Sequence, residues 1–154
     1  MVIAPDSASF RMLSDLVERL PAMVLPKWVD TPSQPIAIED VVEYLAAARD
    51  VPTEEQHAIV EIGGADVVTY RQMLETYASL RHKRRYLVGV PLLTPKLSSL
   101  WTGLVTGVDE HVARPLIDGM THPMVVTDDR AERLFPNIAP RGFKDALRTA
   151  IAAR

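Results

Sequence analysis

The pattern of apolar and polar residues is clearest near the C-terminus, where an apolar side chain returns every three or four positions. This stripe comprises Phe143, Ala146, Leu147, Ala150 and Ile151. The spacing places all of them on one face of an amphipathic helix. The same period predicts helices over 10–20, 39–49 and 70–80, and two more over 97–105 and after Asp109.

Polar and proline residues mark the ends of these helices. Pro21 ends the first one, because proline cannot donate the backbone hydrogen bond that would continue it. Thr69 followed by Gln72 fits a capping box, in which each side chain binds the backbone N–H of the other residue. Asp109 is expected to cap the helix that it precedes, and Pro115 is expected to kink it.

In the stretch 39–49 four apolar residues are expected to face inward. They are Val41, Val42, Leu45 and Ala48. Glu39 and Asp40 fall in the first turn, where negative charge complements the positive end of the helix dipole. Periodicity and charge therefore both predict a helix here.

Short apolar stretches between the helices predict β-strands. They lie at 2–4, 22–25, 34–38, 57–62 and 86–90. Gly63-Gly64 follows the fourth stretch and predicts a sharp turn, because glycine allows positive φ. Because strands alternate with helices, crossover connections and some parallel pairing are expected. We predict a single α/β domain over 1–154, with short, partly parallel strands and about five to six helices.

Composition and charge narrow the possible functions. Hydrophobic residues make up 47% and charged residues 24% of the chain, which is typical of a globular domain. The absence of cysteine excludes disulfides and thiolate catalysis, and a cytoplasmic location is expected. No apolar run approaches the roughly 20 residues that span a bilayer, so we expect no membrane partner. The net charge of -3 disfavours nucleic acid, and the basic run 81–85 is expected to be a solvated helix end.

Motifs that would complete an active site are missing from the sequence. It has no glycine-rich turn between a first strand and helix, which a dinucleotide pyrophosphate needs. None of the 4 tyrosines has a lysine four residues later that would lower the phenol pKa for general acid catalysis. The 4 histidines lack the spacing of metal ligands, and adjacent acids such as Asp128-Asp129 fit helix starts. No catalytic, cofactor or metal-binding residue is therefore assigned to the chain itself.

Several segments follow one another in an order that is typical of one family. They are 21–28, Gln34-Pro35-Ile36-Ala37-Ile38-Glu39-Asp40-Val41, Glu61-Ile62-Gly63-Gly64 with Thr69-Tyr70, and Val90-Pro91 with Pro95. In this succession the chain resembles the C-terminal half of extended and atypical short-chain dehydrogenase/reductase proteins. The NmrA-like and nucleoside-diphosphate-sugar-epimerase-like NAD(P)-binding members are the most similar. The resemblance runs from about Ile3 to Ala152 and rests on order and spacing.

The resemblance implies a partial Rossmann-type C-terminal lobe that lacks the N-terminal nucleotide-binding half. The opening strand at 2–4 is accordingly expected to be truncated. NAD(P) is implied for a full-length family member, whereas this chain alone is expected to bind no cofactor.

The same resemblance implies a set of substrate-facing residues. They are Ser7, Ser9, Phe10, Trp28 and Gln34. The polar members would offer hydrogen bonds, and the two aromatic residues would form an apolar wall. The alternative is that Asp6 or Ser7 caps a helix and that Phe10 and Trp28 pack in the core.

Two functions from different classes are consistent with the sequence. The first is a substrate-binding domain or fragment of an NAD(P)-dependent epimerase/reductase-like protein, incomplete as a catalyst and dependent on a Rossmann-domain partner. The second is a noncatalytic module that forms a homodimer through the surface that a Rossmann half would cover. A nucleic-acid binder that uses 81–85 is a weaker third hypothesis. The small-molecule substrate is not identified by the residues.

Overall fold

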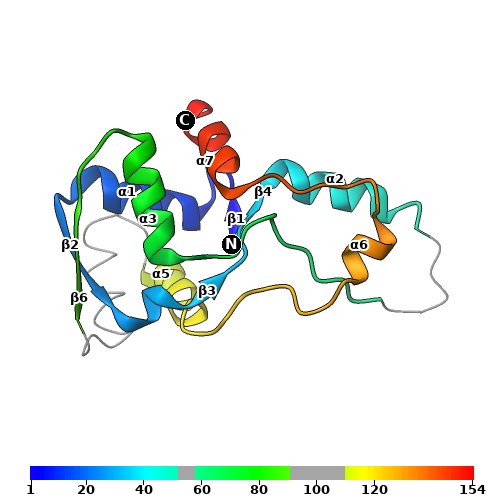
Figure 1. Cartoon of the computed structure of the whole chain (residues 1–154), viewed down its shortest axis with the longest axis horizontal. Helices are drawn as coiled ribbons and strands as arrows, with labels where there is room; N and C mark the ends of the chain where they lie inside the picture. The colour runs from blue at the N-terminus through cyan, green and yellow to red at the C-terminus, as the bar shows by residue number, and fades with distance from the viewer. Residues whose placement is uncertain (52–57, 91–109) are drawn as a thin grey trace.

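The computed structural model describes residues 1–51, 58–90 and 110–154, in which helices and strands alternate (Figure 1). The elements are β1 (Val2–Ile3), α1 (Ala8–Arg19), β2 (Ala22–Pro26), the 3-10 helix η1 (Lys27–Asp30), β3 (Pro32–Ser33), β4 (Ile36–Ala37), α2 (Ile38–Ala48), β5 (Val68–Thr69), α3 (Tyr70–Leu80), β6 (Tyr86–Val90), α5 (Glu110–Gly119), α6 (Arg130–Leu134) and α7 (Phe143–Ala152). Six α-helices and six short strands in these ranges confirm the predicted α/β class. None of the described helices is long and apolar enough to cross a membrane.

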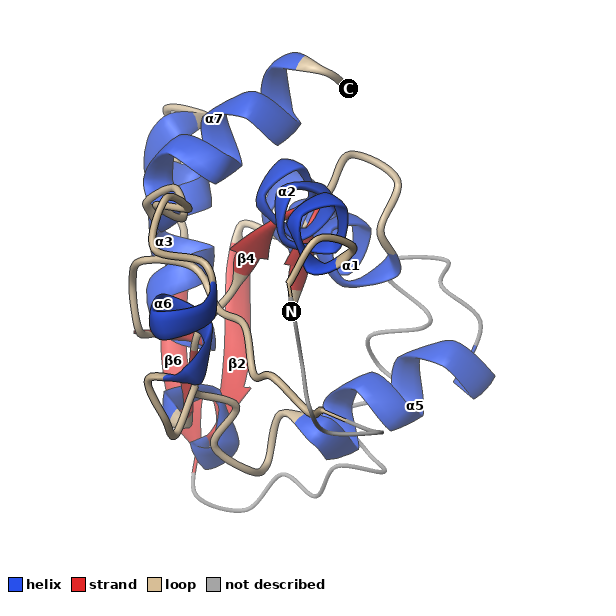
Figure 2. Cartoon of the chain, turned by 90° about the vertical axis from the view of Figure 1, so that its right-hand side faces the viewer, coloured by secondary structure: helices blue, strands red, loops and turns tan. Residues whose placement is uncertain are grey.

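The strands pair two by two. β1 runs parallel to β4, with Val2 opposite Ile36. β2 runs parallel to β6, with Val24 opposite Val88, and Figure 2 shows these two strands side by side. β3 and β5 are antiparallel. Parallel neighbours require a crossover connection, so the predicted alternation of strands and helices and the partly parallel pairing are confirmed.

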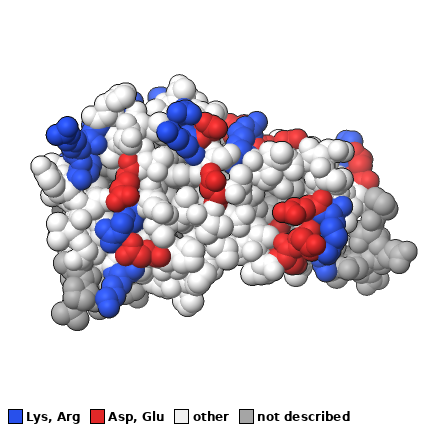
Figure 3. Space-filling view, viewed as in Figure 1, with Lys and Arg blue, Asp and Glu red and all other residues white. Residues whose placement is uncertain are grey.

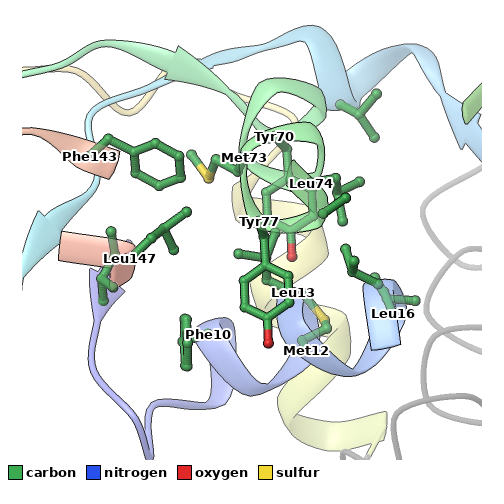
Figure 4. Close-up of a cluster of buried hydrophobic side chains, with 14 of the residues drawn as sticks. Phe10, Met12, Leu13, Leu16, Tyr70, Met73, Leu74, Tyr77, Phe143 and Leu147 are labelled. Carbon is green, nitrogen blue, oxygen red and sulfur yellow. The ribbon is translucent and has the colours of Figure 1, made fainter. Parts of the chain in front are cut away.

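The main core lies where α1, α3 and α7 meet, and their side chains converge in Figure 4. Phe10, Leu13 and Val17 of α1 have no exposed surface. Phe10 meets Tyr77 of α3 edge to face, with the ring centroids 6.0 Å apart. From the predicted stripe of α7 the core receives Phe143, Ala146, Leu147 and Ala150, and Ile151 packs against it. Burial of each large apolar side chain contributes about 2 kcal/mol, so this cluster is the main source of stability.

The capping box predicted for α3 is present. Gln72 N–H donates to Thr69 Oγ1 at 3.2 Å, and Thr69 N–H donates to Gln72 Oε1 at 2.8 Å. These bonds satisfy two backbone donors, one in the first turn of α3 and one at its cap. The helix therefore begins where the sequence predicts.

The basic run at the end of α3 holds that helix against α1. Arg81 Nε donates to Glu18 Oε1 at 2.8 Å, and Lys83 Nζ binds the other oxygen of the same carboxylate. Arg85 Nε donates to the carbonyl oxygen of Val17 at 2.7 Å. The predicted helix end is confirmed, but these cations join two helices instead of being merely solvated.

The buried face of α2 differs from the predicted one. Three of the four residues expected inward are exposed, namely Val42 (56%), Leu45 (67%) and Ala48. Asp40 and Tyr44 are buried instead. Asp40 binds the guanidinium of Arg141, and the Tyr44 ring packs edge to face on Phe135 with centroids 5.4 Å apart. An ion pair and an aromatic pair therefore orient this helix, because its apolar residues lie on more than one face.

The strand predicted over 57–62 is wrong for 58–62, which form no regular structure. Ile59 is 81% exposed, and its carbonyl oxygen accepts from Arg130 Nη1 at 3.1 Å. Glu61 accepts from both Thr127 N–H and Thr127 Oγ1, at 2.8 and 2.9 Å. Residues 58–62 therefore make their polar contacts with the loop before α6 and with the start of that helix. In the described part of the chain they do not pair with another strand, although the stretch is apolar enough to predict one.

Some predictions fall on residues outside the described ranges. These are the helix over 97–105, the cap at Asp109, and Pro91 and Pro95 of the family resemblance. Pro115 does lie inside α5, as predicted.

Candidate functional site

Gln34 lies between β3 and β4, and its side chain joins two segments that are distant in the sequence. Its Nε2 donates to the carbonyl oxygen of Gly64 at 2.8 Å, and its Oε1 accepts from Val126 N–H at 2.9 Å. Its backbone N–H donates to the carbonyl oxygen of Met124 at 2.8 Å. Both ends of the amide are used, so the side chain is held in one position.

The segment that contains Gly63 and Gly64 reaches Gln34 only because both residues lack a side chain. A Cβ at Gly63 would lie 2.6 Å from Gln34 Cδ, and a Cβ at Gly64 would lie 2.1 Å from the carbonyl oxygen of Pro35. Neither glycine adopts the left-handed φ that the pair would allow. Close approach of two chain segments is the physical reason for the pair.

Two hollows meet at Gln34. The large hollow has a volume of about 280 Å³ and is lined by Met1, Gln34, Ile36, Glu61, Ile62, Met124, Val125 and Val126. The acidic hollow has a volume of about 160 Å³ and is lined by Gln34, Tyr44, Glu61, Gly63, Gly64, Ala65, Val126, Asp128, Ala131, Glu132, Ile138 and Pro140. Both are smaller than a typical drug-sized pocket, so each suits a small group or one end of a larger ligand.

The two candidate serines are bound to the chain itself. Ser7 Oγ accepts from Phe10 N–H at 3.2 Å and donates to the carbonyl oxygen of Val2 at 3.0 Å. Ser9 Oγ donates to the same carbonyl oxygen at 3.3 Å. The capping alternative is thus confirmed for Ser7. Neither serine lines the two hollows, and contact of either with a ligand stays a prediction.

The two candidate aromatic residues differ in their surroundings. Phe10 is fully buried in the core, as the packing alternative predicts. Trp28 of η1 is partly buried, and its ring lies 6.5 Å from that of Tyr70 at an interplanar angle of 49°. Trp28 Nε1 and the Tyr70 hydroxyl are buried without a hydrogen-bond partner in the described structure. The apolar wall stays a prediction, and among the five candidates Gln34 is the residue that lines both hollows.

Tyr44, Glu61 and Asp128 line the acidic hollow, but the sequence did not single them out as site residues. Asp128 belongs to an acid pair that fits a helix start, and its Oδ1 does accept from Arg130 N–H at 3.0 Å. Tyr44 lies on a helix whose buried face was assigned to other residues. The one local signal was the Gly63-Gly64 pair, which marks where two segments approach closely.

The first strand–helix turn does not form the cradle that a dinucleotide requires. Residues 4–7 contain no glycine, and the Ser7 side chain already accepts from Phe10 N–H in the first turn of α1. A pyrophosphate would need those backbone amides and close approach of the chain. In the described ranges, no group of three His, Asp or Glu residues could hold a metal ion.

The architecture is one that occurs within NAD(P)-dependent reductases and dehydratases. No protein-family model and no curated protein matches the sequence. Solved structures match along nearly all of this chain, and the chain spans about half of their length. The identities are below 25%, so this likeness concerns the fold.

Three of these structures illustrate the likeness. Triphenylmethane reductase from Citrobacter sp. has a TM-score of 0.68 and 13% identity, with 92% of this chain and 48% of that chain covered. RMD from Pseudomonas aeruginosa, complexed with NADPH, has a TM-score of 0.61 and 12% identity, with coverages of 98% and 44%. TunA, a NAD-dependent NDP-hexosamine 5,6-dehydratase, has a TM-score of 0.60 and 12% identity, with coverages of 99% and 44%.

Proposed function

We propose that this chain is the substrate-binding part of an NAD(P)-dependent reductase or epimerase-like protein of the short-chain dehydrogenase/reductase type. The observation that carries the proposal is the coverage, since 92% of this chain matches 48% of the triphenylmethane reductase chain. A nucleotide-binding Rossmann half would come from another polypeptide or from a longer product of the same gene. The order of segments that resembles NmrA-like and epimerase-like proteins supports the same assignment.

The substrate would meet the chain around Gln34. This residue fixes the wall between the two hollows, and Ser7, Ser9 and Trp28 would contact the substrate from the β1 and η1 side. Residues 4–7 contain no glycine-rich turn. This supports a division of labour in which the chain binds the substrate and the Rossmann half binds the dinucleotide.

A thermal-shift titration with NAD(H) and NADP(H) tests the proposal. A ligand that binds the native state raises its stability, so the chain alone should show no saturable rise in melting temperature. The same chain joined to a Rossmann half encoded upstream, or mixed with a separate one, should show such a rise. Saturable stabilisation of the isolated chain by either nucleotide would refute the division of labour. The absence of stabilisation in the joined protein would refute the family assignment.

A second candidate function is self-association through one face of the β2–β6 pair. Val24 and Val88 lie opposite each other and are 48% and 55% exposed. Tyr86, two residues before Val88 and hence on the same face, is 74% exposed. An exposed apolar face of this kind favours contact with another protein surface.

Light scattering at micromolar concentration tests the second candidate. The wild-type chain should have the mass of a dimer, and Val88→Lys should have the mass of a monomer. If a Rossmann half covers this face instead, the wild-type chain should become a one-to-one complex when that half is added. A monomeric wild-type chain would contradict self-association.

A further inference from the structure

β6 is an edge strand whose outer side is open. β2 pairs with it on one side, and no strand pairs with its other side in the part of the chain that the structure describes. Tyr86, Val88 and Gly89 of β6 are exposed. Figure 1 places β6 at the end of the molecule that lies opposite α2 and α6. A further strand therefore has access to this edge.

The hydrogen-bonding groups on the outer side of β6 belong to Leu87 and Gly89. Tyr86 N–H donates to the carbonyl oxygen of Pro21, which directly precedes β2, at 3.1 Å. In a parallel ladder successive residues direct their N–H and C=O groups to opposite sides, so Val88 also faces β2, whereas Leu87 and Gly89 face outward. Outside the β2–β6 ladder, these two residues form no backbone hydrogen bond with a described residue. Two donors and two acceptors are thus available to a new strand.

The sequence of β6 does nothing to prevent such pairing. Exposed edge strands usually carry lysine, proline or an inward-pointing charge, which keeps other strands away. β6 consists of Tyr86-Leu87-Val88-Gly89-Val90 and contains none of these. Aromatic and β-branched residues suit a pleated sheet, and glycine permits close approach of another backbone. The strand is therefore suited to pairing along its whole length.

The basic residues before β6 favour one orientation if the added strand is β6 of a second copy. Arg84 and Arg85 directly precede the strand. Figure 3 shows basic side chains gathered where α3 ends and β6 begins, and a largely uncharged surface along the margin below them. Parallel strands would place equal residues about 5 Å apart, so the like charges would repel. Antiparallel strands that overlap over 86–90 keep these arginines more than about 20 Å apart, beyond the screening length of about 8 Å.

We propose that two copies of this chain join through β6 in antiparallel orientation, with Val88 on the twofold axis. Leu87 of each copy then exchanges two backbone hydrogen bonds with Gly89 of the other, and the two Val88 side chains form a close non-hydrogen-bonded pair. Tyr86 lies diagonal to Val88 of the second copy, within reach of an aromatic side chain. A twofold contact requires a surface that complements itself, and this edge does, because each outward donor meets an outward acceptor. The inference rests on the second candidate function and names the edge through which the copies associate.

Amide hydrogen exchange of the full chain, followed by ¹⁵N NMR, tests the edge directly. Two concentrations are compared, at which light scattering gives the mass of a monomer and of a dimer. The Leu87 and Gly89 amides should exchange at least about tenfold more slowly in the dimer, because they become hydrogen-bonded there. The Tyr86 and Val88 amides are bonded to β2 in both states and should change little. Equal exchange rates of Leu87 and Gly89 in the two states would overturn the proposal.

A single introduced cysteine tests the position of the axis, since the chain contains no other. Val88→Cys should form a covalent dimer on mild oxidation, because the Cβ atoms of such a pair lie about 5 Å apart and small movements allow a disulfide. Val24→Cys, at an exposed position of β2, is the matched control. It would lie three strand spacings, about 14 Å, from its equivalent and should remain a free thiol. Linkage of Val24→Cys but not of Val88→Cys would contradict pairing through β6.

Two further variants separate edge pairing from contact through the exposed face. Gly89→Pro removes an outward N–H and leaves the ladder with β2 intact, so the dimer should dissociate at least about tenfold more readily. Val24→Lys changes the exposed face away from the new strand and should leave the dimer unchanged. A dimer that resists Gly89→Pro and is broken by Val24→Lys would overturn the edge and retain self-association through the face. A wild-type chain that stays monomeric would overturn both, and the assignment to NAD(P)-dependent proteins would stand.

Discussion

Arg141 binds Asp40 twice, through its backbone N–H at 2.8 Å and through its guanidinium, although the two residues are 101 positions apart. The Asp40 side chain is 2% exposed and that of Arg141 is 43% exposed. The carbonyl oxygen of Arg141 accepts from Ala65 N–H at 3.3 Å. This contact therefore ties α2, the loop after Gly64 and the approach to α7 together.

Asp40→Asn should destabilise the protein by about 2–3 kcal/mol, because it leaves the buried end of a charge-assisted pair without its negative charge. Urea unfolding followed by circular dichroism measures the change. Asp145→Asn is the control, since the Asp145–Arg148 pair has side chains that are 68% and 57% exposed. That substitution should change the free energy of unfolding by less than about 0.5 kcal/mol. Equal effects would contradict the role of Asp40.

Gly64→Ala should destabilise the protein by about 1–3 kcal/mol, because its Cβ would lie 2.1 Å from a backbone oxygen that cannot move aside easily. The melting temperature should fall accordingly. Gly119→Ala at the end of α5 is the matched substitution, since nothing lies within 4 Å of the added carbon. It should be neutral or stabilising by up to about 1 kcal/mol. A neutral Gly64→Ala would show that the two segments are not in close contact.

Stability should depend on pH through Glu18. Partial desolvation raises the pKa of Glu18, but hydrogen bonds from Lys83 and Arg81 and their charges lower it more, so the net shift is downward. The stabilisation is therefore present above the ordinary pKa of 4.5 and is lost as the pH falls through the lower pKa of the folded state. Glu18→Gln should be less stable than the wild type at pH 7, and the difference should vanish in acid. Urea unfolding over a pH series measures it, and a difference independent of pH would contradict this origin.

Tyr70→Phe should leave stability unchanged or raise it by up to about 1 kcal/mol, because the buried hydroxyl has no partner in the described structure. Tyr77→Phe is the comparison, since that hydroxyl donates to Glu18 Oε1 at 3.4 Å and its loss should be slightly destabilising. Thermal unfolding of both variants under one condition measures the contrast. Marked destabilisation by Tyr70→Phe would indicate a partner for its hydroxyl.

Features that depend on neighbouring residues could be predicted from the sequence. Thr69 and Gln72 are three positions apart, and their capping box starts α3 as expected. The stripe from Phe143 to Ala150 repeats with the helical period, so its buried face was predictable as well. In both cases the sequence separation of the interacting residues is within about two helical turns.

Contacts between distant residues could not be predicted in the same way. Asp40 turns α2 toward Arg141, and this overrides the expectation that Val42 and Leu45 face inward. Gln34 was singled out, but its partners Gly64 and Val126 lie 30 and 92 positions away. Periodicity contains no information on such pairings, because they depend on how loops meet after the helices have packed.

The wall formed by Gln34, Glu61 and Val126 is common to both hollows. A substitution in any of these three residues would therefore reshape two cavities at once. Ligand specificity in one of them cannot be engineered through this wall while the other is kept constant. Independent tuning would have to use residues that border a single hollow, such as Tyr44 on one side and Ile36 on the other.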